Sequence, residues 1–332
     1  MVWLRRFLNF LTIISGYLIS RLTHKVIHWG SPMAVSIEPT NLCNLSCKEC
    51  PSGGGELSRP SGTMTAPIFR SVIDQLSPQL TYLTYYFQGE PFLNPEFFVT
   101  IRYARSKKIF VSTSTNGHFF ASSNIVQIIE SGLNRLIISL DGTDQESYAS
   151  YRVGGSFDKV IDGIGHLTEM KKQMKSPSPV LVIQFLVLKT NQHQIRDIKK
   201  LGKQLGVDKV EIKTAQFHDF QKGNPLMPDD PKYSRYVLNR STDLQLDDPP
   251  AQYRIKSHRP NSCFRMWSGC VFTWDGKVVP CCFDKDAKYE MGDMEKNSFQ
   301  EIWKSKNYHD FRVRILKNRK SIDICNNCTQ TF

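Results

Sequence analysis

The sequence predicts an α/β fold: a partial (β/α)6 TIM-like barrel followed by a small C-terminal cysteine-rich domain made of a β-hairpin and a helix. The 332 residues have room for one large and one smaller core. From residue 33, short β-branched runs alternate with longer amphipathic stretches, and six cysteines gather in the last seventy residues. Parallel strands need helical crossovers, so six such units in series favour a parallel sheet that curls into a partial barrel.

Six segments have the β-branched pattern of buried strands, and five segments between them have helical spacing. The predicted strands are Met33–Pro39, Tyr82–Gln88, Phe110–Thr115, Arg135–Leu140, Val180–Leu188 and Lys209–Thr214. The predicted helices are Pro67–Leu76, Glu96–Ser106, Ser123–Ser131, Asp158–Lys172 and Gln194–Leu205. In barrels of this type the functional residues lie on loops at the carboxyl ends of the strands. We therefore expect the chemistry directly after these strands.

The composition is that of an ordinary globular protein, with 40% apolar and 22% charged residues. The net charge of +12 favours an acidic partner, such as a phosphorylated or carboxylated substrate, an acidic peptide or an anionic lipid surface. A solvated basic surface with no single partner explains the charge equally well. The chain lacks a motif that combines basic and stacking residues, so no nucleic-acid partner is expected.

Residues 1–32 are expected to form an N-terminal amphipathic helical segment. Its apolar stretch, Phe7–Ser20, lies between Arg6 and Arg21. This stretch is about fourteen residues long, and a membrane-spanning helix needs about twenty apolar residues, so we expect no span. No convincing signal-peptide cleavage site follows. Two interpretations stay open: peripheral contact with a lipid surface, or packing against the main domain, which is favoured.

Three cysteines, Cys43, Cys47 and Cys50, follow the first predicted strand with the spacing C-x3-C-x2-C. Three thiolates can hold three irons of a 4Fe-4S cube and leave the fourth iron open. Zinc is the competing interpretation, but zinc normally takes four tetrahedral ligands, and no fourth Cys or His is near in the sequence. Disulfides are disfavoured by the odd total of nine cysteines and the missing secretory signal. A reducing, cytoplasmic compartment is therefore expected.

The triplet, in TNLCNLSCKECPS, and the motifs after later strands resemble the radical S-adenosylmethionine (SAM) family. The resemblance implies that Cys43, Cys47 and Cys50 hold a 4Fe-4S cluster whose open iron chelates SAM. The segment QGEP carries Gly89 and Glu90 and resembles the glycine-glutamate motif of the family, in which backbone groups hold the methionyl amine of SAM. A turn before a helix explains the same residues equally well.

The stretches STNG, ISLDG to YRVGGSF, and LKTNQHQI also resemble segments of this family. The resemblance implies that Ser139 and Asp141 approach the ribose hydroxyls of SAM and that Arg152 pairs with its carboxylate as a bidentate fork. It also assigns Asn116 and Asn191 to the SAM site. Each residue alone fits a turn or a helix cap, but their order at successive strand ends favours one cofactor site.

Residues 217–262 break the alternation of strands and helices. Repeated prolines, mixed charges and little periodicity predict a linker or substrate loop. This loop separates a barrel domain, residues 33–216, from a tail domain, residues 263–332.

The tail places Asp275-Gly276, a strong signal for a two-residue hairpin turn, between two apolar runs. Ser298, with Glu301 three residues later, predicts a capped short helix. The tail resembles the auxiliary-cluster domain of radical SAM enzymes called SPASM, or twitch when abbreviated. The resemblance implies a second 4Fe-4S cluster saturated by four thiolates. The ligands that it implies are Cys263, Cys281, Cys325 and Cys328.

Three points about the tail stay open at this stage. Either Cys281 or Cys282 can be the ligand. Cys270 can be a small buried residue without a metal. The same four ligands can also hold zinc in a purely structural domain.

The resemblance implies a radical SAM enzyme that cleaves SAM reductively to a 5'-deoxyadenosyl radical. The auxiliary cluster would then help to modify a peptide, protein or small-molecule substrate oxidatively. An electron donor such as a flavodoxin or ferredoxin is implied as a partner. The alternatives are a radical SAM enzyme with a structural zinc tail and a non-catalytic metal-binding interaction module. No general base is distinguished among Glu38, Tyr85, His218 and Asp219.

Overall fold

The computed structural model describes residues 2–238, 253–257 and 260–329. A curved sheet runs through the molecule in the order β11-β10-β9-β1-β2-β3-β4-β5-β6. Its strands are Ala34–Ile37 (β1), Tyr82–Thr84 (β2), Phe110–Thr115 (β3), Arg135–Ser139 (β4), Val180–Val187 (β5), Lys209–Thr214 (β6), Gly269–Phe272 (β9), Lys277–Val279 (β10) and Gly292–Asp293 (β11). Neighbours from β1 to β6 are all parallel, as the repeated β-α pattern predicts.

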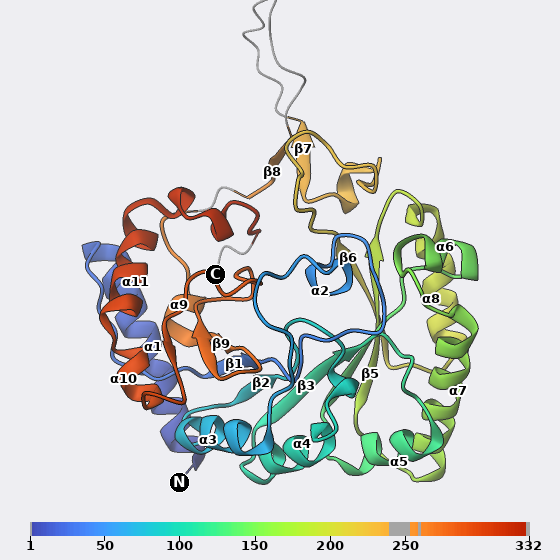
Figure 1. The fold of residues 1–332 in the computed structure, drawn as a ribbon, viewed down its shortest axis with the longest axis horizontal. Helices are drawn as coiled ribbons and strands as arrows, with labels where there is room; N and C mark the ends of the chain where they lie inside the picture. Colours follow the sequence, from blue (N-terminus) through green and yellow to red (C-terminus); the bar gives the residue numbers. More distant parts are fainter. Residues whose placement is uncertain (1, 239–252, 258–259, 330–332) are drawn as a thin grey trace, which may run out of the picture.

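Most of the helices surround the outer side of this sheet (Figure 1). The helices are Val2–Thr23 (α1), Pro51–Gly54 (α2), Ala66–Leu76 (α3), Phe97–Ser106 (α4), Ser122–Glu130 (α5), Gln145–Tyr151 (α6), Phe157–Gln173 (α7), Ile195–Gln204 (α8), Arg265–Ser268 (α9), Phe299–Trp303 (α10) and Lys306–Asn318 (α11). Short 3-10 turns occupy Pro91–Leu93 (η1), Gln192–Gln194 (η2), Pro231–Tyr233 (η3), Arg319–Ser321 (η4) and Asp323–Cys325 (η5). The α/β class and the partial barrel are confirmed.

The five predicted crossover helices correspond to α3, α4, α5, α7 and α8, with ends that differ by at most one residue. Each buries an apolar face; in α5 that face is Ile125, Ile128 and Ile129. The second strand differs more, because β2 ends at Thr84 and not at Gln88. The chain leaves the sheet there and turns through Gly89, which has a φ of 72°.

The tail joins the barrel more closely than the sequence analysis expected. The predicted hairpin forms as β9 and β10, with Gly276 in the turn, but β9 also pairs in parallel with β1 and extends the barrel sheet. Gly269 permits this approach, because a Cβ atom at that position would lie 2.3 Å from the carbonyl oxygen of Ala34. A contact between segments so far apart in the sequence leaves no local pattern. The capping box of Ser298 and Glu301 is present at the start of α10.

The N-terminal helix α1 is 22 residues long and extends beyond the apolar stretch Phe7–Ser20 at both ends. By length and composition alone, α1 meets the requirement for a membrane span. One of its faces packs on the tail: the ring of Tyr17 makes edge contacts with Phe264 and Trp267 at centroid distances of 5.2 and 5.5 Å. The start of the helix is fixed by Arg6, whose guanidinium donates to three backbone carbonyls of the barrel.

The segment predicted as a linker contains regular structure of its own. Tyr236–Leu238 (β7) and Tyr253–Ile255 (β8) pair as an antiparallel ribbon that the sequence analysis did not predict. Residues 239–252 and 258–259 of this predicted linker lie outside the described residues.

Gly269→Ala is expected to destabilise the junction between the tail and the barrel. The added methyl group must displace β9 from β1, and overpacking of this kind costs about 1–3 kcal/mol of unfolding free energy. Gly165→Ala in α7 is the matched control, because a Cβ there meets no atom within 4 Å and alanine favours helix. Anaerobic chemical unfolding followed by circular dichroism should show a lower midpoint only for Gly269→Ala. Equal midpoints for both variants would contradict the packing argument.

Candidate active site

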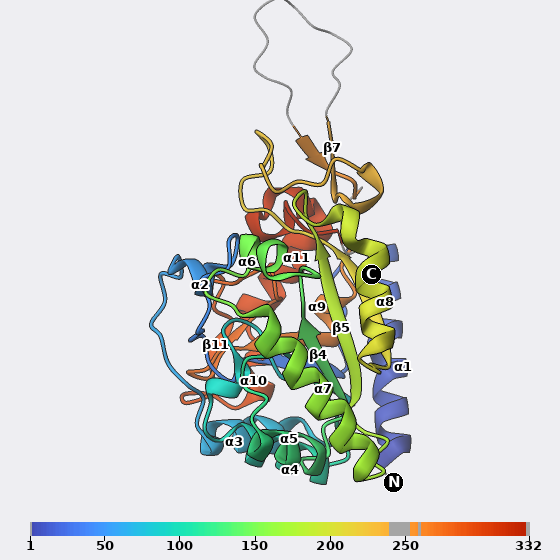
Figure 2. The ribbon, with the colours of Figure 1, turned by 90° about the vertical axis from the view of Figure 1, so that its right-hand side faces the viewer.

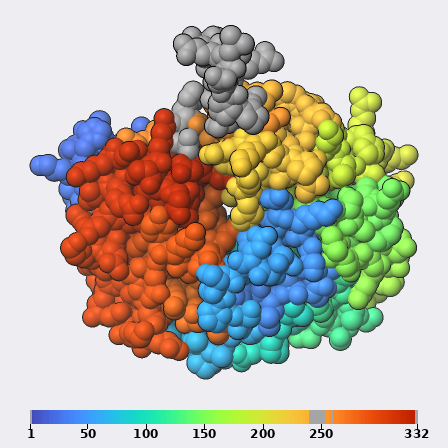
Figure 3. Space-filling model, turned by 45° about the horizontal axis from the view of Figure 1, so that its top comes forward, coloured from blue at the N-terminus to red at the C-terminus, as the bar shows by residue number. Residues whose placement is uncertain are grey.

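A cavity of about 550 Å³ lies at the carboxyl ends of the barrel strands. Its walls come from the cysteine loop before α2, the strand ends, the segment after β6 and the tail. Figure 3 shows the surface hollowed where these blue, yellow and orange segments meet. Among the residues predicted from the sequence, the lining includes Cys43, Cys47, Cys50, Gly89, Glu90, Asn116, Ser139 and Arg152.

The cysteine loop is held by the segment that follows α6. The backbone N–H groups of Ser46 and Lys48 donate to the carbonyls of Val153 and Tyr151. Burial raises the pKa of the Cys47 thiol to about 11, and the Arg152 guanidinium opposes that shift. The Nη1 atom of Arg152 lies 3.8 Å from the Cys47 sulfur. Thiols must lose their protons to bind iron, so Arg152 is the cation positioned to favour the thiolate.

Glu90 ties the loop after β2 to the end of β3. Its buried carboxylate accepts hydrogen bonds from the backbone N–H of Asn116 and the hydroxyl of Thr115, both at 2.7 Å. Burial raises the pKa of Glu90 to about 7, and these hydrogen bonds oppose the shift. The preceding Gly89 lets the backbone pass close to Thr40, whose carbonyl oxygen would lie 2.5 Å from an added Cβ. The predicted glycine-glutamate turn therefore forms one wall of the cavity.

Asp141 occupies a different position from the one that the sequence analysis gave it. It does not line the cavity. One carboxylate oxygen binds Arg152 Nε and Nη2 at 2.7 and 2.6 Å, and the other accepts from the N–H of Leu186 at 2.7 Å. With both oxygens engaged, Asp141 is not available for the ribose hydroxyls. Its contacts orient Arg152, which does face the cavity.

Asn191 also lies behind the cavity wall. Its side chain is fully buried and bridges the N–H of Leu188 and the carbonyls of Asp141 and Leu186. These contacts use the donors and acceptor of the amide. The placement of Asn191 in the SAM site is therefore not supported by the geometry.

None of the four candidate bases lines the cavity. Glu38 is fully buried in a bidentate ion pair with Arg59. Tyr85 is fully buried in the hydrophobic core, and His218 and Asp219 are exposed elsewhere on the surface.

The inner faces of the barrel strands contribute polar side chains that the sequence analysis missed. They are Ser36, Thr84, Ser114, Gln184 and Thr214. Ser139, which the analysis did predict, belongs to the same set. A period-two search for polar positions at the end of each predicted strand would have found them, because alternate side chains of a strand point to one face.

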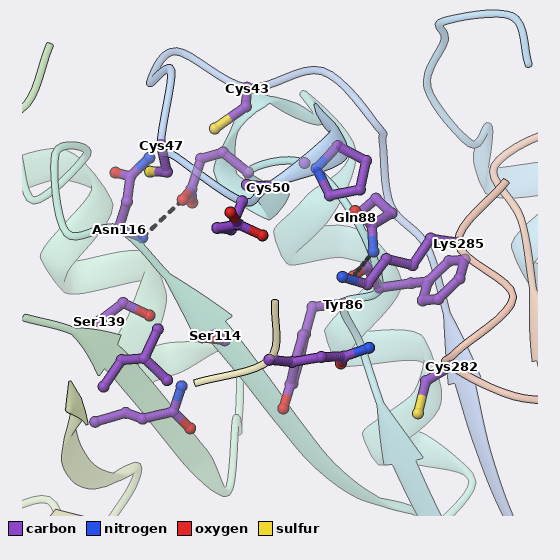
Figure 4. A pocket seen from close by; sticks show the side chains of 18 of the residues that line it. Cys43, Cys47, Cys50, Tyr86, Gln88, Ser114, Asn116, Ser139, Cys282 and Lys285 are labelled. Carbon is purple, nitrogen blue, oxygen red and sulfur yellow. Dashed lines mark hydrogen bonds between the residues drawn. The ribbon is translucent and has the colours of Figure 1, made fainter. Parts of the chain in front are cut away.

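The tail supplies the opposite side of the cavity through Cys282, Lys285 and Arg265. Figure 4 shows Cys282 and Lys285 across the cavity from Cys43 and Cys47. The neighbouring Cys281 does not line the cavity. Burial is the main cause that raises the pKa of its thiol, and Cys282, Cys263 and Cys325 are close enough to add to the shift. Adjacent cysteines therefore face different surroundings, and Cys281 lies beside two of the other predicted ligands.

Three cations, Arg235, Arg265 and Lys285, converge on this side of the cavity. Arg265 donates to the Cys282 sulfur at 2.8 Å, and Arg235 donates to the hydroxyl and carbonyl of Thr214. Burial lowers the pKa of both Lys285 and Arg235. In the described part of the chain, none of the three pairs with a carboxylate. This side of the cavity therefore concentrates positive charge, and Glu49 and Glu90 are the carboxylates that also line the cavity.

The donor set suits iron–sulfur chemistry better than zinc. Cys43, Cys47 and Cys50 are gathered on one loop, and soft thiolates are the usual ligands of iron–sulfur clusters. A single zinc ion needs its ligands at about 2.3 Å. Among the described residues, no group of three or more His, Cys, Asp or Glu side chains is arranged around one such metal ion.

Comparison with known families agrees with this geometry. The model of the radical SAM superfamily matches residues 37–202, half of the chain. The model of SPASM, described as an iron-sulfur cluster-binding domain, matches residues 263–329. The zinc-tail and non-catalytic alternatives are therefore not favoured.

Similar proteins extend over most of the chain. The AdoMet-dependent heme synthase of Nitratidesulfovibrio vulgaris is 24% identical over 316 residues, which cover 86% of this chain and 83% of that protein. The PqqA peptide cyclase of Rhodopseudomonas palustris is 23% identical over 270 residues, covering 76% and 68%. The structure of Streptococcus suis SuiB bound to the precursor peptide SuiA has a TM-score of 0.64 at 12% identity and covers 95% of this chain and 78% of that one.

At this identity the structural likeness shows the fold alone. The family matches supply the cofactors: a 4Fe-4S cluster with SAM in the barrel, and auxiliary iron–sulfur binding in the tail. The chain belongs to the radical SAM superfamily, and it is a radical SAM enzyme with a C-terminal SPASM domain.

Proposed function

We propose that this enzyme oxidises a carboxylate-bearing peptide or small molecule held between the barrel and the tail. The observation that carries the proposal is the single cavity lined by the three loop cysteines on one side and by tail residues on the other. When bound at the loop, the cluster and SAM supply a 5'-deoxyadenosyl radical that abstracts hydrogen from the substrate. The protein positions the substrate and keeps water away.

The residues of the barrel have separate roles in this proposal. Cys43, Cys47 and Cys50 hold the SAM-binding cluster. Gly89 allows backbone groups to approach the amine of SAM, as its positive φ and close contacts support. Arg152 faces the cavity with its guanidinium fixed by Asp141, which suits the carboxylate of SAM.

Further contacts to SAM are proposed for neighbouring residues. The Ser139 hydroxyl, the Asn116 amide and the Glu90 carboxylate line the same cavity. Asp141 and Asn191 support these groups from behind the wall.

For the auxiliary cluster we propose Cys263, Cys281, Cys325 and Cys328 as ligands. The buried side chain of Arg319 supports this set of ligands. Its guanidinium donates to the Cys328 sulfur at 3.2 Å. Arg319 also lies near Cys263 and Cys325, so one buried cation faces three of the four sulfurs. Positive charge at this place offsets the negative charge of bound thiolates.

The substrate class follows from Arg235, Arg265 and Lys285. All three side chains are partly buried. Partly buried cations without a carboxylate ion pair are costly, and an anionic group of the substrate would relieve that cost. The names of the relatives support both a peptide and a small molecule, since one is a peptide cyclase and another a heme synthase. An electron donor such as a flavodoxin or ferredoxin and a reducing, cytoplasmic location complete the proposal.

Anaerobically reconstituted protein is expected to hold about eight irons per chain and to form 5'-deoxyadenosine from SAM and a reductant. Cys50→Ala removes a ligand of the SAM-binding cluster, so about four irons and no 5'-deoxyadenosine should remain. Cys270→Ala is the matched control, because Cys270 is buried in the hydrophobic core. Zinc in place of iron, or a fully loaded protein that leaves SAM intact, would contradict the proposal.

Cys281→Ala and Cys282→Ala should separate the two adjacent cysteines. Loss of Cys281 is expected to reduce iron to about four per chain and to leave SAM cleavage in the barrel intact. Loss of Cys282 is expected to leave about eight irons, because its sulfur faces the cavity. Iron and sulfide analysis of both variants measures the difference. The reverse pattern would make Cys282 the ligand.

The substitution Lys285→Gln tests the proposal that the substrate carries a carboxylate. In paired assays of candidate substrates, a free carboxylate should stimulate 5'-deoxyadenosine formation and its methyl ester should not. The variant is expected to raise KM for the acid about tenfold, because it removes one partner of a desolvated charge pair. Substrate-free SAM cleavage should not change. The exposed Lys288 provides the control Lys288→Gln, and equal stimulation by acid and ester would refute the idea.

A further inference from the structure

The outer face of α1 carries five leucines in a row along the helix, which we name the leucine stripe. Its members are Leu4, Leu8, Leu11, Leu18 and Leu22, with exposed fractions of 63, 52, 44, 48 and 82%. Their separations of four, three, seven and four residues place them on one helical face. The exposed Ser15 lies between Leu11 and Leu18 on this face. An exposed apolar face of this kind marks a site of interaction with another molecule or a membrane.

The helix cannot bury the stripe by rotating, because its opposite face is fixed to the domain. Arg6 donates to the carbonyls of Lys108, Ser77 and Lys107 at 2.7, 3.1 and 3.1 Å. Toward the other end, the ring of Tyr17 packs against Phe264 and Trp267 of the tail at centroid distances of 5.2 and 5.5 Å.

Exposed aromatic rings flank the stripe at both ends. Trp3 and Phe7 lie near the start of the helix and Trp29 lies just beyond its end, with exposed fractions of 68, 56 and 61%. Tryptophan favours the boundary between headgroups and acyl chains, where one part of the ring is apolar and the N–H meets water. Their position fits a helix that lies along a lipid surface.

The charged residues of the N-terminal segment have one sign. The chain has no Asp or Glu before Glu38. Arg5, Arg21 and Lys25 are exposed. Beside the first turn of α1, a groove of about 650 Å³ is lined by apolar side chains of the helix and also by Lys108 and by Lys107, which pairs with Asp74. Anionic lipid headgroups are the partner that complements both the cations and the apolar face.

The position of α1 leaves the active site accessible. Figure 2 shows α1 along the edge of the molecule opposite α2, the helix that follows the cysteine loop. Docking through the stripe therefore leaves the loop side in solution.

We propose that α1 docks this enzyme on an anionic lipid surface, with the leucine stripe at the acyl boundary and Arg5, Arg21 and Lys25 against headgroup phosphates. A transmembrane orientation would require the packed face and the Arg6 contacts to detach. A second copy would bring two basic surfaces together, which like-charge repulsion opposes. The lipid surface satisfies both features at once.

Flotation of the full-length, cluster-loaded enzyme tests this proposal. The enzyme should bind vesicles of phosphatidylcholine with phosphatidylglycerol and bind pure phosphatidylcholine vesicles weakly. The double variant Leu8→Glu/Leu18→Glu should lose at least about tenfold in vesicle affinity, because it places charge in the apolar face. Leu238→Glu on β7 is the matched control, since Leu238 is 42% exposed and lies far from α1 in sequence. Substrate-free SAM cleavage by all variants should stay unchanged and reports intact folding.

Arg5→Gln/Arg21→Gln tests the electrostatic part and should weaken binding to the anionic vesicles and reduce its salt dependence. Three outcomes would overturn the proposal. They are unchanged affinity of the leucine variant, equal binding to neutral and anionic vesicles, and membrane retention that resists carbonate extraction. A wild-type dimer that the leucine variant converts to a monomer without lipid would instead assign the stripe to a second copy of the chain.

Discussion

The buried ion pair between Glu38 and Arg59 joins the end of β1, the segment after the cysteine loop and the tail. The active site depends on all three. Glu38 follows β1, and its two oxygens accept from Arg59 at 2.5 and 2.7 Å and from the backbone N–H of Trp274 in the tail hairpin at 3.1 Å. Arg59 also donates to the carbonyl of Lys285. Burial raises the pKa of Glu38, and the guanidinium opposes that shift. Removing one partner leaves an unpaired buried charge, which lowers the free energy of unfolding by about 3–5 kcal/mol. Substitution of either residue would therefore weaken the junction.

This junction explains why the tail forms one wall of the barrel cavity and is not a separate domain on a linker. The pairing of β9 with β1 fixes the direction of the hairpin, and Arg59 fixes the segment that carries Lys285. Cys282 then faces the cavity while Cys281 turns toward Cys263 and Cys325. The cysteine loop thus lies on one side of the cavity, and Cys282, the neighbour of the proposed ligand Cys281, lies on the other. A substrate held in the cavity would contact both the loop and the tail.

Local sequence patterns predicted the strands, helices and turns whose formation depends on neighbouring residues. The β-α alternation located the parallel strands, and Asp275-Gly276 located the hairpin turn. Eight of the predicted site residues line one cavity. The missed polar residues on the inner strand faces had a local period-two signal, and the other differences depend on contacts between separate segments. Asp141 was given to the ribose because its pairing with Arg152 depends on how α6 folds back. The parallel pairing of β9 with β1 and the orientation of Lys285 depend on contacts between distant segments, which leave no periodic signal in the sequence.

The net charge of +12 acts in two physically different settings. Around α1 the cations are exposed, so their attraction to an anionic surface is long-ranged and is screened within about 10 Å at moderate salt. In the cavity, Arg265 and Lys285 are partly buried, so salt screens their attraction for an anion less. Increasing ionic strength should therefore release the enzyme from a lipid surface before it affects an acidic substrate in the cavity. The two roles proposed for the basic residues thus differ in their sensitivity to salt.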